Sequence, residues 1–282
     1  MTAERTYRFR DGKELRLGAR TLVMGILNVT PDSFSDGGRW NRRDDALCHM
    51  EEMVRDGADI IDIGAESSRP GFVPMSAAEE IERLLPFLEA VLPECPVPVS
   101  VDTFKAETAR AALAAGAHLL NDIWGLQYPE EPGAMAQGAA EADVPVVVMH
   151  NQNGTAYDGD VIAAMRGFFL RSFEIADAAG LARENIILDP GIGFGKTAEQ
   201  NMHVMRRMDE LISYAGTDYP LLLGASRKSF IGAALDLPVE ERMEATGAAC
   251  VLGITRGASI VRVHDVKPIA RMCRMTDAIL GA

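Results

Sequence analysis

The chain has 282 residues, of which 48% are hydrophobic and 24% are charged. This composition is typical of a globular protein and excludes a disordered, collagen-like or coiled-coil chain. The 28 basic residues stand against 41 acidic residues, and the net charge of −13 disfavours binding to nucleic acid or to an anionic membrane surface. No apolar stretch approaches the roughly 18 residues of a membrane span, and charges occupy residues 1–17 where a signal peptide needs an apolar segment, so we expect a cytoplasmic protein.

The first predicted element is a β-hairpin near the start of the chain. Apolar and polar residues alternate over residues 7–17 on both sides of an Asp-Gly pair, which is a hairpin pattern. We expect residues 1–20 to form an N-terminal extension that covers the bottom of the barrel predicted below and has no role in catalysis.

Eight short apolar runs follow, each bounded by Gly, Pro, Asn or Asp, and each is typical of a buried strand. They span residues 22–27, 59–63, 97–101, 117–120, 144–149, 185–188, 221–223 and 259–263. Helical spacing of apolar residues lies between them, as over residues 42–55, 77–92, 106–115, 161–179 and 245–255. Continuous apolar strands alternating with helices predict a parallel sheet covered by helices. Eight such units favour a closed (β/α)8 barrel of α/β class, with residues 21–282 as one barrel domain, over an open doubly wound sheet. No G-x-G-x-x-G turn follows the first strand, which disfavours a dinucleotide-binding domain.

The cysteines do not form a recognisable metal or disulfide pattern. Cys48, Cys95, Cys250 and Cys273 lie far apart and include no C-x-x-C pair. We expect reduced, partly buried thiols.

Polar residues follow nearly every predicted strand. In a parallel barrel the active site lies at the carboxyl ends of the strands, so these residues are expected to converge. They include Asn28, Asp102, Asn121, Asp189, Lys228, Arg262 and His264, while Asp62 lies within the second run. Any one aspartate in this position could instead cap the next helix. A whole ring of polar groups is costly to bury without partners, and it therefore predicts a ligand with many hydrogen-bonding edges.

The chemistry of these side chains predicts two adjoining subsites. Two carboxylates, an amide and an ammonium suit a flat heterocycle that carries both donors and acceptors. Arg262 and His264 precede a helix that begins near Asp265, and this arrangement suits an anion, a diphosphate rather than a carboxylate. Asn28 offers a neutral oxygen to a Mg²⁺ shared with that anion.

Two long loops follow the first and second strands. They are rich in Gly, Ser and Pro and carry Phe34, Asp36 and Arg69. We expect them to form a lid over the site, the alternative being solvated loops without a role.

Seven segments, in order along the chain, make it resemble the bacterial dihydropteroate synthase family. They are residues 24–38, 61–71, 100–104, 121–122, 188–196, 226–230 and 262–266. The resemblance implies a (β/α)8 homodimer that joins 6-hydroxymethyl-7,8-dihydropterin diphosphate to p-aminobenzoate with Mg²⁺, in folate biosynthesis, and that sulfonamides inhibit. Ser68 departs from the Thr of many members, but it keeps the hydroxyl.

The resemblance also implies a role for each matching residue. The pterin site comprises Asp102, Asn121, Ile123, Met149, Asp189, Phe194, Gly224 and Lys228. The diphosphate site comprises Asn28, Ser68, Arg69, Arg262 and His264, with Asn28 also the metal ligand. The p-aminobenzoate site comprises Ser67, Arg69, Pro70, Phe194, Lys228 and Ser229. The catalytic residues implied are Phe34, Asp36, Arg69, Asp102 and Lys228.

Two alternatives remain open at this point. A methyltetrahydrofolate-binding methyltransferase barrel would share Asp102, Asn121 and Asp189 but has no need of the motifs at 67–71 and 226–228. A paralogue could also bind pterin without condensing it.

A few further residues are assigned from their positions. His150 either lines the pterin pocket or caps its strand. Lys105 and Arg110 are assigned to the helix at 106–115 and to solvent, and the apolar helix at 245–255 is a candidate dimer contact.

Overall fold

The computed structural model describes residues 4–29, 39–66 and 75–281. The barrel strands are β3 (Leu22–Asn28), β4 (Ile60–Gly64), β5 (Val99–Asp102), β6 (Leu119–Asp122), β7 (Val146–Met149), β8 (Ile186–Asp189), β11 (Leu221–Leu223) and β12 (Ala258–Val263). The helices are α1 (Arg39–Asp56), α2 (Ala77–Glu94), α3 (Ala106–Ala115), α4 (Ala134–Ala142), α5 (Val161–Ala179), α6 (Ala198–Arg206), α7 (Ser229–Leu235), α8 (Met243–Thr255) and α9 (Val266–Leu280).

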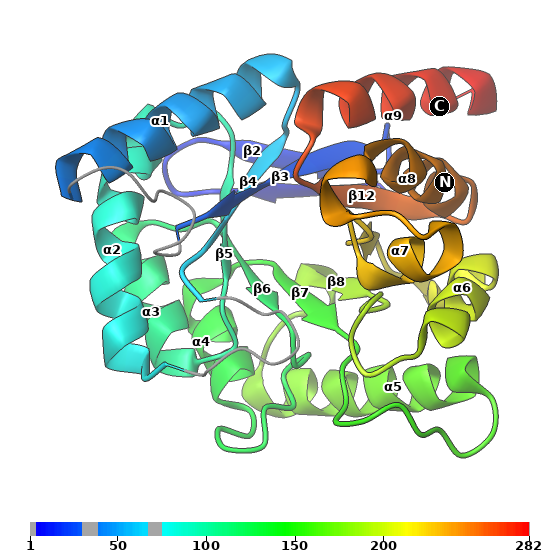
Figure 1. The fold of residues 1–282 in the computed structure, drawn as a ribbon. Coiled ribbons are helices and arrows are strands. Elements are labelled where there is room, and N and C mark those ends of the chain that lie inside the picture. The colour runs from blue at the N-terminus through cyan, green and yellow to red at the C-terminus, as the bar shows by residue number, and fades with distance from the viewer. Residues whose placement is uncertain (1–3, 30–38, 67–74, 282) are drawn as a thin grey trace.

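These strands form a closed parallel barrel with the order β11-β12-β3-β4-β5-β6-β7-β8, and the helices surround it (Figure 1). The ring closes where Leu221 of β11 pairs with Leu188 of β8 on one side and with Ala258 of β12 on the other. The predicted (β/α)8 class is therefore confirmed. Between β8 and β11 the chain adds a small antiparallel pair, β9 (Ser213–Tyr214) and β10 (Thr217–Asp218).

The predicted N-terminal hairpin is also present. Strand β1 (Arg5–Arg8) pairs antiparallel with β2 (Glu14–Leu17), and Tyr7 faces Leu15 in the register. Tyr7, Leu15 and Leu17 are buried in one cluster with the first inward-facing residues of the barrel strands, among them Ile60 and Leu222. The hairpin thus covers the amino-terminal end of the barrel, which leaves the carboxyl end for the site.

Alternation along the strands divides the barrel interior into two layers. Successive side chains of a strand point to opposite sides, so residues two apart share a side. Ile60, Leu119, Ile187 and Ile260 lie in the apolar bottom layer. Two residues further along the same strands come Asp62, Asn121, Asp189 and Arg262. The upper layer of the barrel is therefore polar because of the strand period, and it opens toward the loops.

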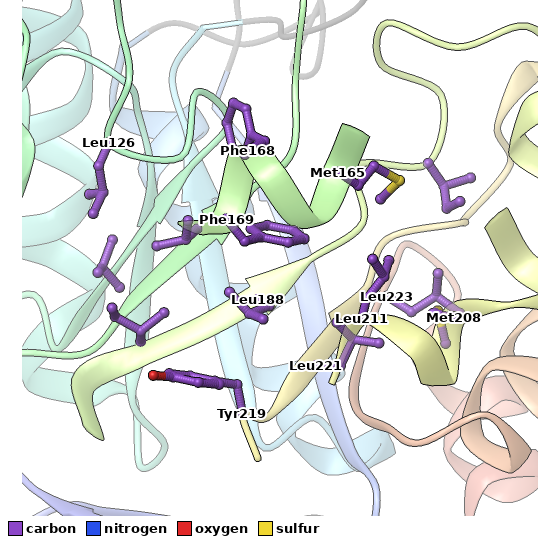
Figure 2. Packing of buried hydrophobic residues seen from close by; sticks show 14 of the residues in the cluster. Leu126, Met165, Phe168, Phe169, Leu188, Met208, Leu211, Tyr219, Leu221 and Leu223 are labelled. Carbon is purple, nitrogen blue, oxygen red and sulfur yellow. The ribbon is translucent and has the colours of Figure 1, made fainter. Parts of the chain in front are cut away.

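The intervening residues of the strands face outward into the helices. Phe169 and Phe173 of α5 are fully buried in the larger outer cluster, which also contains Leu188 and Leu221 of the strands. Figure 2 shows the Phe169 ring between Phe168 above it and Leu188 below it, with Leu223, Leu211 and Met208 of the same cluster to the right. Complete burial of such side chains contributes about 1.5–3 kcal/mol each, so this layer fixes the barrel rigidly.

Two further expectations concern the cysteines and the membrane. All four cysteines are free; Cys95, Cys250 and Cys273 are buried, while Cys48 is exposed rather than partly buried because it lies on the outer side of α1. Within the described residues, no helix is long and apolar enough to cross a membrane.

Candidate active site

The center of the polar layer is an arginine between two aspartates. Arg262 of β12 donates from Nε to Asp62 Oδ2 and from Nη2 to Asp102 Oδ2, each across 2.6 Å. Asp62 is fully buried, and its Oδ1 has no hydrogen-bond partner among the residues that the structure describes. Burial raises the pKa of Asp102 to about 7, which Arg262 opposes. One guanidinium thus neutralises part of the charge of two carboxylates below the pocket.

Strand β6, which pairs with β5, contributes one residue to the inner side and one to the outer side of the barrel wall. Asn121 points inward, where its Nδ2 donates to Asp62 Oδ2 at 3.3 Å and its Oδ1 has no partner within the described part of the chain. Asp122 points outward and accepts the backbone N–H groups of Trp124 and Leu126 at 2.8 and 2.6 Å. Asn121 is therefore available to a ligand, whereas Asp122 shapes the loop after β6.

Lys228 and Asp189 face each other across the opposite part of the rim. Asp189, at the end of β8, accepts the Gly191 N–H at 2.7 Å, and burial raises the pKa of its carboxyl. Lys228 donates to the Ile192 carbonyl, and its Nζ lies 4.4 Å from the centre of the Phe194 ring. Burial lowers the pKa of Lys228 to about 8, while Asp189 opposes this shift. An ammonium and a carboxylate thus lie close enough to interact at the carboxyl-end opening of the barrel.

Apolar side chains complete the wall of this space. Ile123, Met149 and Phe104 form a buried cluster of their own, and Trp124, Tyr128 and Phe194 pack against it. Gly224 follows β11, and a Cβ built on it would lie 3.8 Å from Asp189 Oδ2. The pocket therefore combines flat apolar walls with polar groups at its floor, as a planar heterocycle requires.

The remaining predicted residues lie at the rim near β3 and β12. Asn28 ends β3 and is half-buried; its side chain has no hydrogen bond to another described residue. His264 follows β12, and its Nδ1 lies 3.0 Å from Ser226 Oγ. Ser229 is the exposed first residue of α7.

A strained residue sets the direction of Lys228. Arg227 adopts a left-handed conformation with φ of 56°, which is rare for a residue with a side chain. Its guanidinium Nε and Nη2 donate to the two carboxylate oxygens of Asp265, at 2.9 and 2.6 Å, and its backbone N–H donates to the hydroxyl of Thr246. The strain directs the chain into α7 with Lys228 over the pocket.

The structure brings together the predicted residues from β3, β5, β6, β7, β8, β11 and β12. Phe34, Asp36, Ser67, Ser68, Arg69 and Pro70 lie outside the described residues, and so does the predicted lid.

Among the buried charged residues, Asp62 and Lys196 received no role from the sequence, and Lys105 received a wrong one. Asp62 could have been found, because a carboxylate inside an apolar strand needs a partner. Lys196 ends the motif at 188–196, yet it was not singled out. Lys105 was assigned to solvent, and this was wrong: it is 6% exposed and pairs with Glu66 and with Glu80 Oε2, the latter at 3.0 Å. Its partners lie 39 and 25 residues away, beyond the reach of a helical pattern.

His150 belongs to the support of the pocket rather than to its surface. It is buried, its Nδ1 lies 2.9 Å from Lys196 Nζ, and its ring packs edge-on against Phe168. Met149, which precedes it, faces the pocket.

Comparison with known proteins places the chain in one family. A model of the pterin-binding enzymes matches residues 24–264. The dihydropteroate synthase of Bacillus subtilis is 53% identical over 262 residues, which cover 93% of this chain and 90% of that protein. The solved dihydropteroate synthase of Clostridium difficile, determined in the presence of pteroic acid, is 48% identical with a TM-score of 0.89 and coverage of 93% and 98%. That of Yersinia pestis, in a sulfonamide drug complex, is 40% identical with a TM-score of 0.88 and coverage of 99% and 100%.

Identity at this level over nearly the whole of each chain does not arise by chance. The motifs, the barrel and the polar layer support the same family. The chain therefore belongs to the dihydropteroate synthase family, which confirms the resemblance, the enzyme class and the place in folate biosynthesis that the motifs predict.

Proposed function

We propose that the pocket at the carboxyl end of this barrel binds 6-hydroxymethyl-7,8-dihydropterin diphosphate and p-aminobenzoate and joins them. The observation that carries this proposal is the inward-facing polar layer, to which Asn121 and Asp189 belong, together with the electrostatic interaction of Lys228 with Asp189 and Asp102. Pteroic acid, present with the Clostridium difficile relative, contains both halves of the proposed product.

The pterin ring is complementary to the floor of this pocket. The carboxylates of Asp102 and Asp189 accept from ring N–H and amino groups, while Lys228 and Asn121 serve the carbonyl and ring nitrogens. Ile123, Met149 and Phe194 contact the faces of the ring, and Gly224 leaves room beside Asp189.

The diphosphate fits the rim between β3 and β12. Arg262 uses Nε and Nη2 for the two aspartates and keeps Nη1 for a phosphate oxygen. His264 stands just before the N-terminus of α9, where backbone N–H groups favour an anion. Ser68 and Arg69, from the second loop, complete this subsite in the proposal.

The residues present also fit a magnesium ion. Mg²⁺ takes few protein oxygens and completes its shell with phosphate and water, and the uncommitted carboxamide of Asn28 at the rim offers one such oxygen. When bound there, Mg²⁺ would neutralise negative charge on the leaving diphosphate.

In this proposal the p-aminobenzoate lies beside Lys228, Phe194 and Ser229. Ser67, Arg69 and Pro70 of the second loop complete its subsite, and Phe34 and Asp36 of the first loop close it. A sulfonamide has the same arylamine and an acidic group opposite it, so it competes for this subsite. We expect sulfamethoxazole to inhibit the enzyme competitively with p-aminobenzoate, and indifference of an active enzyme to the drug would contradict this placement.

The reaction requires positioning and charge stabilisation more than proton transfer. The bond from the pterin methylene carbon to the diphosphate oxygen breaks with its electron pair on the oxygen, and the arylamine nitrogen forms the new bond to that carbon. The carboxylates of Asp102 and Asp189 stabilise the positive charge left on the pterin, and Arg262 stabilises the departing anion. The amine loses its proton after attack, so no protein base is obligatory.

We also propose a homodimer through the C-terminal helices. Leu252 of α8 and Met275, Ile279 and Leu280 of α9 are exposed apolar side chains on two helices that pack together. Exposed apolar groups of this kind mark interaction surfaces. Light scattering is expected to give twice the chain mass of 30.5 kDa, and a monomer would refute the proposal.

Diphosphate release tests the function directly. The purified enzyme is supplied with the pterin diphosphate and Mg²⁺, with and without p-aminobenzoate. We expect dihydropteroate and diphosphate only when both substrates are present. Tight pterin binding without product would indicate the non-condensing paralogue. No pterin binding would mean that the polar layer binds another ligand.

A further inference from the structure

A second lysine of the pocket region lies beneath the loop after β8. Lys196 is 7% exposed, and none of its side-chain contacts within the described residues is to a carboxylate. Its Nζ instead lies 2.9 Å from His150 Nδ1 and donates to the carbonyls of Gly191 and Phe194, both at 3.0 Å. Lysines are rarely buried without an ion pair, so these three contacts must offset the loss of hydration.

The contacts are consistent with a protonated lysine and a neutral histidine. Burial, reinforced by the Lys196 charge, lowers the pKa of His150 to about 2, which leaves Nδ1 free to accept. Burial lowers the pKa of Lys196 to about 7, against the opposing effect of Asp189. Three acceptors thus use all three ammonium protons when Lys196 is protonated, which its pKa of about 7 makes the main form below pH 7.

The same loop presents its other side to the pocket. Lys228 donates to the carbonyl of Ile192, and its ammonium lies over the Phe194 ring. Gly193 touches Lys228 so closely that a Cβ built on it would lie 2.8 Å from the Lys228 Cδ. Residues 191–194 are therefore enclosed between two lysines, one beneath the loop and one in the pocket.

Other contacts anchor the edges of the loop. The hydroxyl of Tyr157 donates to the Gly195 carbonyl at 2.8 Å, and Asn201 Oδ1 accepts the Gly193 N–H at 2.8 Å. Of these anchors, only Lys196 donates to the carbonyls at both ends of the 191–194 turn. It also links them to His150, the residue that follows β7.

We propose that Lys196 is a positioning residue of the pterin site, whose buried ammonium holds residues 191–194 in the shape that directs Lys228 toward the ligand. It touches no substrate and acts through Lys228. The inference rests on the proposed role of Lys228 in pterin binding.

A double-mutant cycle on pterin affinity tests this inference. Pterin binding is measured by calorimetry at pH 7 for the wild type, Lys196→Met, Lys228→Met and the double variant, with melting temperatures for each. Lys196→Met is expected to weaken binding about tenfold, and the double variant is expected to bind as Lys228→Met does, because residues that act through one another are not additive. Lys267→Met, whose side chain is 58% exposed on α9, is the matched control and should leave binding unchanged.

Two results would overturn the proposal. One is a folded Lys196→Met variant with wild-type pterin affinity, and the other is a double variant whose loss is the product of the single losses, as a general structural role would give. If Lys196→Met fails to fold, the cycle is run with Lys196→Gln, whose amide keeps two donors but cannot make all three contacts, and which is held to the same criteria. Because the readout is pterin binding, the test is separate from the proposed reaction: a wild type that binds pterin without forming dihydropteroate refutes the proposed function alone.

Discussion

Arg262 and Asp62 are 200 residues apart in the chain, yet the guanidinium Nε donates to the carboxylate Oδ2 across 2.6 Å inside the barrel. Asp62 also accepts from Asn121, so one carboxylate that faces no solvent aligns two predicted ligand residues. Its position under the pocket makes it a support for the pterin and diphosphate subsites.

Asp62→Asn is expected to lower both stability and pterin affinity. Breaking a buried ion pair costs about 3–5 kcal/mol, and we expect the lower end because Arg262 keeps Asp102. Urea unfolding measures this loss. The matched control is Asp177→Asn, which breaks the Arg183 pair on the surface and should cost about 1 kcal/mol or less. Equal losses in the two variants would contradict the buried role of Asp62.

Pterin affinity is expected to pass through a maximum near pH 7. Asp102 accepts from the ring only as a carboxylate, and its raised pKa of about 7 means that affinity increases as pH rises toward 7. The ammonium groups of Lys196 and Lys228 have pKa values lowered to about 7 and about 8, so the loss of their protons decreases the affinity as pH rises further. Calorimetry over pH 5.5–9.5 measures the profile.

Two variants test which group causes the rise in affinity with pH and which causes the fall. Asp102→Asn should remove the rise near pH 7. Lys228→Arg should move the Lys228 part of the fall to higher pH if the variant binds, because a guanidinium stays protonated up to about pH 12. A profile that the two substitutions leave unchanged would mean that other groups titrate.

Lys105→Met is expected to destabilise the fold strongly. Glu80 is buried, and Glu66 accepts both from Lys105 and from the Met75 N–H, so Lys105 balances two carboxylates at the base of the second loop. Removing the cation leaves both unpaired, which costs about 3–5 kcal/mol in urea unfolding. Arg110→Met, on the exposed side of α3, should change stability by less than about 0.5 kcal/mol. A small loss for Lys105→Met would show that the carboxylates find other partners.

Leu15→Ala tests whether the hairpin stabilises the barrel without affecting catalysis. Leu15 is buried in the bottom layer, so truncation should cost about 2–5 kcal/mol. The folded variant should keep the wild-type kcat and KM, since the pocket lies at the other end. Leu235→Ala, at a 54% exposed position of α7, should be close to neutral. A change in KM with Leu15→Ala would mean that the bottom layer is coupled to the site.

Much of the barrel could be predicted from the sequence because the strand and helix periods are local. The run at 221–223 and the helices at 106–115 and 161–179 have the predicted bounds. Several other strands begin one or two residues later than predicted, as β5 and β6 do, because the first apolar residues of each run still belong to the joint with the preceding helix. Helix α4 was not predicted, since a segment rich in Ala and Gly carries a weak apolar pattern.

By itself, the sequence determined the alternation of elements, the barrel class and the set of polar residues at the strand ends, because those features depend on neighbours within a few residues. Only the tertiary structure decided which of these residues face inward and which charges neutralise one another. Arg262 meets Asp62 and Asp102, and Lys196 meets His150, only when distant strands close into a ring. The identity of a buried charge's partner depends on distances in space, and no local pattern of residues contains them.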